Sequence, residues 1–309
     1  MFQNVAVAGL GLVGSSLLHA MRRGGLAGKT VGVDSDKSVR TRAEELKLAD
    51  EIASPTAACA SGADLVILAV PLGAMKDVAA TLAPGLAAGT IVTDVGSSKR
   101  SVIRDMAEVL PDGVHFVPGH PIAGTEQSGP DAGFAELFDG RWCVLTPDDT
   151  TDKEALARVK AFWQAIGCDI EIMTADHHDV VLAITSHLPH LIAYNIVGTA
   201  ADLEDITSSE VIKFSAGGFR DFTRLAASDP VMWRDVCLNN KDAILEMLAR
   251  FSEDLSALQR AVRWDDGAAL FDLFTRTRAV RRRIVDAGQE TADPDFGRQA
   301  TAPGPASKT

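Results

Sequence analysis

Apolar positions divide the chain into two halves of different character. In residues 1–173, short apolar runs alternate with segments of helical periodicity, whereas residues 174–288 carry helical periodicity alone. The run at residues 64–70 is almost continuously apolar, which is typical of a strand buried on both faces of a parallel sheet. Strands that alternate with helices predict an α/β doubly wound sheet. The predicted strands lie at residues 5–8, 30–33, 64–70, 90–94, 115–117, 142–145 and 169–173.

The second half predicts an all-α domain and then a tail. Helices are expected at residues 175–198, from Ser228 or Asp229 through Ile244 toward residue 258, and at 267–287. Pro189 should kink the first of them locally, because proline removes a backbone donor. Residues 213–224 concentrate glycine, aromatic and charged side chains and predict a loop. Residues 289–309 lack an apolar period and predict a disordered tail, so the expected divisions are 1–173, 174–288 and 289–309.

A glycine-rich turn follows the first strand and opens a helix. Gly9-Leu10-Gly11-Leu12-Val13-Gly14 is the G-x-G-x-x-G pattern in the strand–turn–helix context that dinucleotide binding requires. The second strand ends at Asp34, an acid that would bond the adenosine ribose and disfavour a 2′-phosphate, so NAD is the expected cofactor. The first domain is therefore predicted to be Rossmann-type. The expected cofactor-binding residues are Gly9, Gly11, Leu12, Val13, Gly14, Asp34, Val70 and Pro71.

Composition and charge narrow the class of partner. The 309 residues carry a formal net charge of -12, which argues against nucleic acid or an anionic membrane as a partner. An anionic substrate would then need arginines placed at its site. The chain starts directly with a strand pattern, so no signal peptide is expected, and its four cysteines match no disulfide or metal spacing. We therefore expect a cytoplasmic protein with reduced thiols.

The most apolar long segment, residues 180–201, is interrupted by His187, Pro189, His190 and Asn195. It is expected to be a helix buried inside protein rather than a membrane span. His187 and His190 lie three residues apart and share one helix face. They are core histidines or a metal pair; because no third ligand is adjacent, no metal is expected.

Residues 117–129 gather a histidine, a carboxylate, hydroxyls and glycines after a short strand. His120 precedes a proline, which restricts its backbone to extended conformations. The glycine turn, Pro71, Ser97 and His120 should all lie at carboxyl ends of strands of one sheet, where ligands of such folds bind. An active site is predicted there, although a structural turn is the alternative for the loop and helix capping is the alternative for Ser97 or Ser98.

These motifs together resemble those of the prephenate/arogenate (cyclohexadienyl) dehydrogenase family, over residues 3–286. The resemblance rests on an ordered set of six motifs, of which only the first is shared widely by other families. They lie at residues 9–14, 93–99 (Thr-Asp-Val-Gly-Ser-Ser-Lys), 119–126 (Gly-His-Pro-Ile-Ala-Gly-Thr-Glu), 186–190 (Ser-His-Leu-Pro-His), 217–224 (Gly-Gly-Phe-Arg-Asp-Phe-Thr-Arg) and 229–233 (Asp-Pro-Val-Met-Trp).

The resemblance implies both a reaction and residue roles. Prephenate or arogenate would lose a hydride to NAD and its ring carboxylate as CO2. His120 would accept the proton of the ring hydroxyl, with Ser97 bonded to the same hydroxyl. His190 would lie at the substrate side chain and Arg224 at a substrate carboxylate. The implied substrate-binding set is His190, Arg224, Thr125, Glu126, Asp221 and Trp233, in which Glu126 and Asp221 form an ionic gate with Arg224 and Trp233 lines the pocket.

Elementary chemistry agrees with this assignment. Alcohol oxidation needs a base that is neutral near pH 7, as histidine is, and a dianionic substrate suits a guanidinium. The family also implies a second domain that forms a homodimer. Two alternatives stay open: a β-hydroxyacid-type dehydrogenase, whose catalytic lysine would have to be Lys241, and a non-catalytic NAD-binding regulator.

Overall fold

A computed structural model of the protein describes residues 1–125, 127–203 and 213–286. Glu126 and the predicted tail at 289–309 lie outside the described residues. The chain divides into two compact units, Met1–Met247 and Leu248–Thr309, which are described separately. All residues of the predicted site that the structure describes belong to the first unit.

The first unit is built around a six-stranded sheet in which every neighbouring pair of strands is parallel. The strand order is β3-β2-β1-β4-β5-β6. Successive strands are added outward from β1 on one side and outward from β4 on the other, so a ligand crevice is expected outside the carboxyl ends of these two strands. The predicted doubly wound sheet is confirmed. Its strands are β1 (Phe2–Ala8), β2 (Ala27–Val33), β3 (Glu51–Ala53), β4 (Leu65–Leu68), β5 (Ile91–Asp94) and β6 (His115–Val117).

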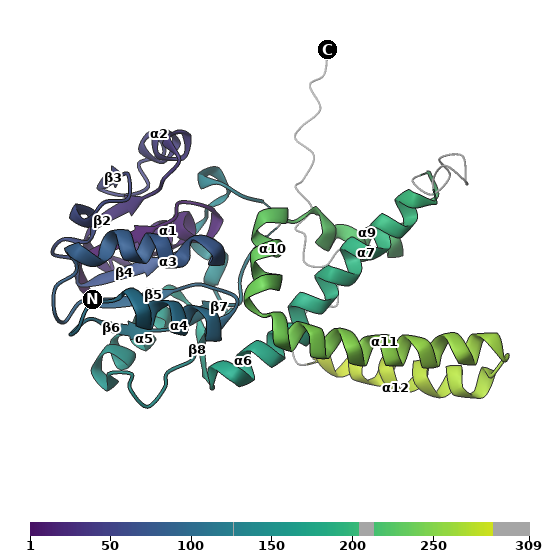
Figure 1. Cartoon of the computed structure of the whole chain (residues 1–309). Coiled ribbons are helices and arrows are strands. Elements are labelled where there is room, and N and C mark those ends of the chain that lie inside the picture. The colour runs from purple at the N-terminus through teal and green to yellow at the C-terminus, as the bar shows by residue number, and fades with distance from the viewer. Residues whose placement is uncertain (126, 204–212, 287–309) are drawn as a thin grey trace, which may run out of the picture. The chain divides into compact units, whose positions relative to one another are not determined.

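Side chains alternate across this sheet and build two cores, with helices on both faces (Figure 1). Val5 and Val7 of β1 face α1 and α5, whereas Ala6 and Ala8 face α3 and α4. Burial of apolar side chains on both faces is the main stabilising contribution, at about 1.5–3 kcal/mol for each large residue. The helices of this part are α1 (Leu12–Gly24), α2 (Lys37–Glu45), α3 (Leu72–Leu82), α4 (Lys99–Val109) and α5 (Lys153–Ile166), with short 3-10 turns η1 (Ala57–Ala60), η2 (Ala83–Gly85), η3 (Pro130–Ala132) and η4 (Ala135–Phe138).

His120 does not lie in a loop of the main sheet, contrary to the prediction. The main sheet ends at Val117, and residues Gly119–Pro121 form β7 of a separate three-stranded sheet with β8 (Trp142–Leu145) and β9 (Asp169–Ile172). β7 pairs antiparallel with β8, which sets His120 opposite Val144. Three residues containing a glycine and a proline are too few for a sequence pattern to reveal a strand. The ladder nevertheless holds His120 more rigidly than a loop would.

The helical run that begins at Ala175 is interrupted just before Pro189, as predicted. α6 (Ala175–Leu182) passes into a π-helical turn, η5 (Ala183–His187), and then α7 (Leu188–Asp202), with Pro189 in the first turn of α7. The wider π turn accommodates the backbone N–H that Pro189 lacks.

Two other helix predictions need correction. Gly217–Thr223, expected in a loop, forms the short helix α9, followed by the 3-10 turn η6 (Arg224–Ala227); its two glycines occupy the first turn, where helices tolerate them. The helix capped by Asp229 ends at Asn239 as α10 (Pro230–Asn239) instead of continuing. Asn240 separates it from α11 (Lys241–Arg263) with non-helical backbone angles, φ -115° and ψ 35°, and its side-chain amide bonds Asp179 and His187.

The run Ala175–Asp202 is long and apolar enough to span a membrane by length and composition alone, a test that core helices of other proteins also pass. It was expected to be buried inside protein. Within this single chain, however, only 28% of its most apolar window is buried. Ile184, Ile196 and Val197 are among its exposed apolar side chains.

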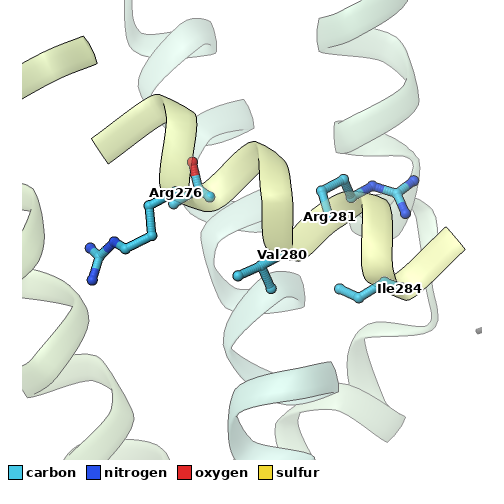
Figure 2. Close-up of a pocket in the computed structure, with 5 residues that line it drawn as sticks. Arg276, Val280, Arg281 and Ile284 are labelled. Carbon is cyan, nitrogen blue, oxygen red and sulfur yellow. The ribbon is translucent and has the colours of Figure 1, made fainter. Parts of the chain in front are cut away.

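The second unit contains the end of α11 and the helix α12 (Gly267–Asp286). The two are joined by a turn in which Asp265 has a positive φ of 52°. The expected last helix is thus confirmed as far as Asp286. Figure 2 shows Arg276, Val280, Arg281 and Ile284 of α12, which with Thr277 line a shallow cavity of about 310 Å³. None of these residues belongs to the predicted site.

Candidate active site

The glycine turn between β1 and α1 has the close packing that a dinucleotide cradle requires. Gly9 has a φ of 96°, and a Cβ there would lie 2.3 Å from the carbonyl oxygen of Ala69. A Cβ on Gly14 would lie 1.8 Å from the carbonyl oxygen of Gly9. At Gly11, in contrast, a Cβ would meet no atom of the described residues within 4 Å. The turn is therefore closed against its own protein at Gly9 and Gly14 and open at Gly11, where a phosphate group would approach.

The start of α1 leaves its backbone donors available to an anion. Gly11 occupies the N-cap position and offers no side chain to cap the helix, and the first turn, which includes Leu12 and Val13, carries no acidic residue. Such an end binds phosphate through its N–H groups and dipole. Asp34, at the end of β2, accepts a hydrogen bond of 2.9 Å from the Leu10 N–H, so the predicted ribose acid lies at the glycine turn.

Val70 and Pro71 follow β4, the strand beside β1, and Pro71 occupies the N-cap position of α3 without a side-chain capping bond. The Val70 side chain lies next to Gly9, at 3.0 Å from the position that a Cβ there would occupy. The residues predicted for the cofactor thus converge at the topological switch of the sheet. Their arrangement fits NAD.

Gly11→Ala separates cofactor binding from folding. Because the added methyl meets no atom within 4 Å and the backbone φ is -73°, the melting temperature should not change. The methyl would occupy the space through which pyrophosphate approaches, so the Kd for NAD should rise at least about tenfold. Calorimetric titration and a thermal melt on the same sample check both parts. Unchanged NAD affinity would show that the cofactor does not bind at this turn.

A buried ion pair holds the backbone of the residue that precedes His120. Lys99 and Asp94 have fully buried side chains; the Lys99 ammonium contacts the Asp94 carboxylate and donates to the Gly119 carbonyl oxygen at 2.6 Å. Asp94 also accepts from the N–H groups of Gly119 and Gly96, at 3.1 and 2.8 Å. The pair thus binds both backbone groups of the residue preceding His120.

His120 is the first member of a hydrogen-bonded chain that ends on a carboxylate. Its Nδ1 lies 2.8 Å from His178 Nε2, and His178 Nδ1 lies 2.8 Å from Asp179 Oδ1. Asp179, a residue of α6, in turn accepts from the N–H groups of Lys99 and Arg100, at 2.7 and 3.1 Å. Its carboxylate therefore caps the N-terminus of α4. All three members are buried.

This environment keeps the histidines neutral. Burial above all, and then the charges of His178, Lys99 and His187, hold the pKa of His120 well below its usual value. Burial also lowers the pKa of His178, although its bond to Asp179 opposes the shift. Burial raises the pKa of Asp179, but the bonds from His178, Lys99 and Arg100 outweigh it, so that pKa is lowered overall. Near pH 7 the chain consists of two imidazoles and one carboxylate.

A second group of aromatic residues lies around Trp233. The His190 ring stacks on Trp233 with a centroid distance of 3.6 Å and an interplanar angle of 21°, and His187 meets the same indole edge-on at 6.1 Å. His190 Nδ1 donates to the Ser186 carbonyl oxygen at 2.8 Å, which leaves Nε2 as the acceptor. Burial lowers the pKa of His190, an effect to which the Arg224 charge adds. His190, Trp233 and Arg224 therefore converge.

His187 is a core histidine, one of the two readings left open by its spacing. Asn240 Nδ2 donates to His187 Nδ1 at 3.1 Å and to the Asp179 carbonyl oxygen at 2.8 Å. The burial of His187 lowers its pKa to about 4. Its Nε2 and the Trp233 Nε1 are buried polar atoms that have no hydrogen-bond partner among the residues the structure describes.

The remaining predicted residues are placed less closely together. Ser97 is half-buried, and within the described residues no hydrogen bond joins it to His120. Thr125 is exposed, and its hydroxyl accepts from the Gln127 N–H at 3.2 Å. Asp221 lies 3.7 Å from its neighbour Arg220. Since Glu126 is outside the described residues, the structure leaves the ionic gate as a prediction.

Helix capping at α4 differs from the expectation for Ser97 and Ser98. Ser98 is the N-cap residue, yet its hydroxyl makes no capping bond and instead donates to the Asn239 carbonyl oxygen at 3.1 Å. Asp179 supplies the cap.

Sequence reasoning missed His178 and Asp179 as parts of the site and gave Asp94, Lys99 and Asn240 no role. One signal was present, because Asp176-His177-His178-Asp179 is a polar run at the start of an otherwise apolar helix.

A glycine-rich dinucleotide turn and a buried neutral histidine, on a doubly wound sheet followed by helices, define a dinucleotide-dependent dehydrogenase. Comparison with known proteins specifies which kind. The prephenate dehydrogenase nucleotide-binding domain family matches residues 17–172, and the prephenate dehydrogenase dimerization domain family matches residues 174–276. The chain therefore belongs to the prephenate dehydrogenase family.

Individual relatives agree with this assignment. The chain is 43% identical to cyclohexadienyl dehydrogenase of Zymomonas mobilis over 91% of this chain and 95% of that one. It is 33% identical to prephenate dehydrogenase of Bacillus subtilis, over 91% and 76% of the two chains. The crystal structure of Aquifex aeolicus prephenate dehydrogenase with hydroxyphenyl propionate and NAD+ superposes with a TM-score of 0.86 at 34% identity, covering 92% of this chain and 99% of that one.

Proposed function

We propose that this protein catalyses the NAD-dependent oxidative decarboxylation of prephenate, arogenate or both, giving 4-hydroxyphenylpyruvate or tyrosine. The observation that carries the proposal is the neutral His120, buried and aligned by His178, on a chain that matches cyclohexadienyl dehydrogenase over nearly its whole length. When bound, NAD supplies the hydride acceptor for the ring carbinol carbon. The glycine turn, Asp34, Val70 and Pro71 would hold it.

The side chains of this protein would then handle the proton and the carboxylates. His120 accepts the proton of the ring hydroxyl, and Ser97 bonds the same oxygen. His190 and Trp233 face the substrate side chain, with Thr125 beside them, and Arg224 binds a carboxylate. Glu126 and Asp221 gate the entrance with Arg224. Loss of CO2 needs no further group, because it makes the ring aromatic.

Arg224→Ala should weaken substrate binding more than it slows the chemistry. Hydrogen bonds to a charged group contribute about 1.5–3 kcal/mol, so KM should rise roughly 10–150-fold while kcat stays within about threefold. Steady-state rates over a range of substrate concentrations measure both constants. Arg104→Ala, which changes an exposed arginine of α4 paired with its neighbour Asp105, is the matched control. A fall in kcat at unchanged KM would contradict the assignment of Arg224.

The assembly is proposed to be a cytoplasmic homodimer. The matched dimerization domain includes Ala175–Asp202, whose most apolar window is only 28% buried in the single chain. A second copy would cover its exposed apolar residues. The four cysteines are free, as suits a reducing compartment.

The test of the function is production of NADH and CO2 from each substrate, measured side by side with NAD and NADP. Turnover of either substrate with NAD is expected, and the ratio of the two rates decides between prephenate and arogenate. The absence of turnover with both, in protein that still binds NAD, would refute the proposal. The β-hydroxyacid alternative has less support, because Lys241 is an exposed residue at the start of α11. The regulator alternative explains the glycine turn but not the histidine chain.

A further inference from the structure

We infer that Asp179 and His178 act as positioning residues that fix the tautomer of His120 and hold its proton during turnover, an inference that rests on the proposed function. One nitrogen–nitrogen contact, between His120 and His178, and one nitrogen–oxygen contact, between His178 and Asp179, are each 2.8 Å long. They join the three side chains into one chain of hydrogen bonds. In such a chain the protonation state of the last member decides the state of the first.

The direction of each hydrogen bond follows from the carboxylate. Asp179 can only accept, so the proton on His178 resides on Nδ1. His178 Nε2 then carries the lone pair and accepts from His120 Nδ1–H. The remaining nitrogen of His120, Nε2, is left without a proton. The carboxylate therefore makes His120 Nε2 a base, although the two side chains do not touch.

The carboxylate cannot easily become the final proton acceptor. Asp179 already accepts from the N–H groups of Lys99 and Arg100 at the start of α4, and its pKa is lowered despite burial. A proton that enters at His120 Nε2 can displace the Nδ1 proton of His120 onto His178 Nε2. The product is an imidazolium at His178 paired with the Asp179 carboxylate. Because Asp179 is buried and bonded to α4, the chain ends inside the protein and not at solvent.

A hydrogen-bonded chain that ends at a buried carboxylate matches a reaction in which the proton is held and then returned. The ring hydroxyl loses its proton as its carbon gives up the hydride, and the same oxygen is a hydroxyl again in the phenolic product. The prephenate dianion that loses a hydride and CO2 becomes the 4-hydroxyphenylpyruvate monoanion, whose phenol is protonated. The reaction therefore releases no net proton from that oxygen. The proton must be held during the hydride step and then returned. Reversal of the two transfers returns it from His120 Nε2 to the phenolate oxygen.

The test combines a tautomer measurement with kinetics. In protein with 15N-labelled histidine, free of substrate, the ring shifts of His120 should show an unprotonated Nε2 and a protonated Nδ1. Asp179→Leu removes the acceptor that holds the proton on His178 Nδ1, so both imidazoles should populate both tautomers and a fraction of His120 Nε2 should become protonated. Its kcat should fall roughly 10²–10⁴-fold, the contribution of general-base catalysis, because the imidazolium at His178 also loses its carboxylate partner, while the Kd for NAD stays unchanged.

Three further measurements keep the inference separate from folding and from the assigned reaction. His178→Gln retains an oxygen that can accept from His120 Nδ1–H, so it should keep more activity than His178→Leu, which retains none. Ser98→Ala removes a hydroxyl 3.3 Å from Asp179 Oδ2 without touching the histidines and should leave the His120 tautomer unchanged.

The pH profile is the third measurement. In the wild-type protein kcat/KM should be flat at neutral pH and fall only well below pH 6.5, because burial above all, beside His178, Lys99 and His187, disfavours protonation of His120. A protonated His120 Nε2 in the wild-type protein would overturn the inference, as would an unchanged tautomer in Asp179→Leu. Because the tautomer is read without substrate, a wild-type protein with the expected tautomer but no turnover would refute only the proposed function.

Discussion

His120→Asn should lower kcat by at least about 100-fold, because general-base catalysis contributes roughly 10²–10⁴-fold and asparagine cannot accept a proton near pH 7. The same factor should appear in kcat/KM, since the base acts in the transition state and not in ground-state binding. Initial rates at saturating NAD and substrate measure the effect. Turnover within a few fold of the wild-type protein would refute the role of His120.

The variant should fold normally. An asparagine amide can donate to His178 Nε2 in place of the His120 Nδ1–H, so the bond to the rest of the chain is retained. The Kd for NAD should be unchanged, because the glycine turn lies on β1 and α1 while His120 lies on β7. A loss of activity accompanied by weaker NAD binding or a lower melting temperature would point to a structural effect instead of the loss of a base.

Local motifs explain which parts of the site could be predicted from sequence. The glycine turn and the strand before it are contiguous, and Asp34 follows at a spacing set by one helix and one strand. The structure joins them through the bond from the Leu10 N–H to Asp34. Convergence of strand ends at one edge of a parallel sheet follows from topology alone, so the neighbourhood of Pro71 was also foreseeable.

The histidine chain could not be predicted in the same way. His178 is 58 residues from His120, and its buried ring nitrogens are bonded to His120 and Asp179. Helical periodicity assigns polar residues such as His178 and Asp179 to the solvated face. Their burial depends on partners in β7 and α4 that no local pattern reveals. The break at Asn240 has the same origin, since its amide bonds Asp179 and His187.

The buried pair of Lys99 and Asp94 gives the largest expected effect on stability. Lys99→Met keeps the length of the side chain but leaves the Asp94 carboxylate and the Gly119 carbonyl oxygen without their cationic partner. Breaking one half of a buried pair costs about 3–5 kcal/mol. The melting temperature should therefore fall by roughly 6–20 °C, at about 2–4 °C for each kcal/mol in a unit of this size. Differential scanning calorimetry with NAD absent measures it.

Two further variants decide whether the charge or the packing is responsible. Lys76→Met makes the same change in an exposed pair with Glu108 and should shift the melting temperature little, because solvent already screens that pair. Asp94→Asn combined with Lys99→Met removes both charges and should recover most of the lost stability. The double variant should nevertheless stay poorly active, since the bond from Lys99 to the Gly119 carbonyl oxygen is also what holds the backbone beside His120. Equal melting temperatures for the single and double variants would mean that packing of the Lys99 side chain, and not its charge, stabilises the site.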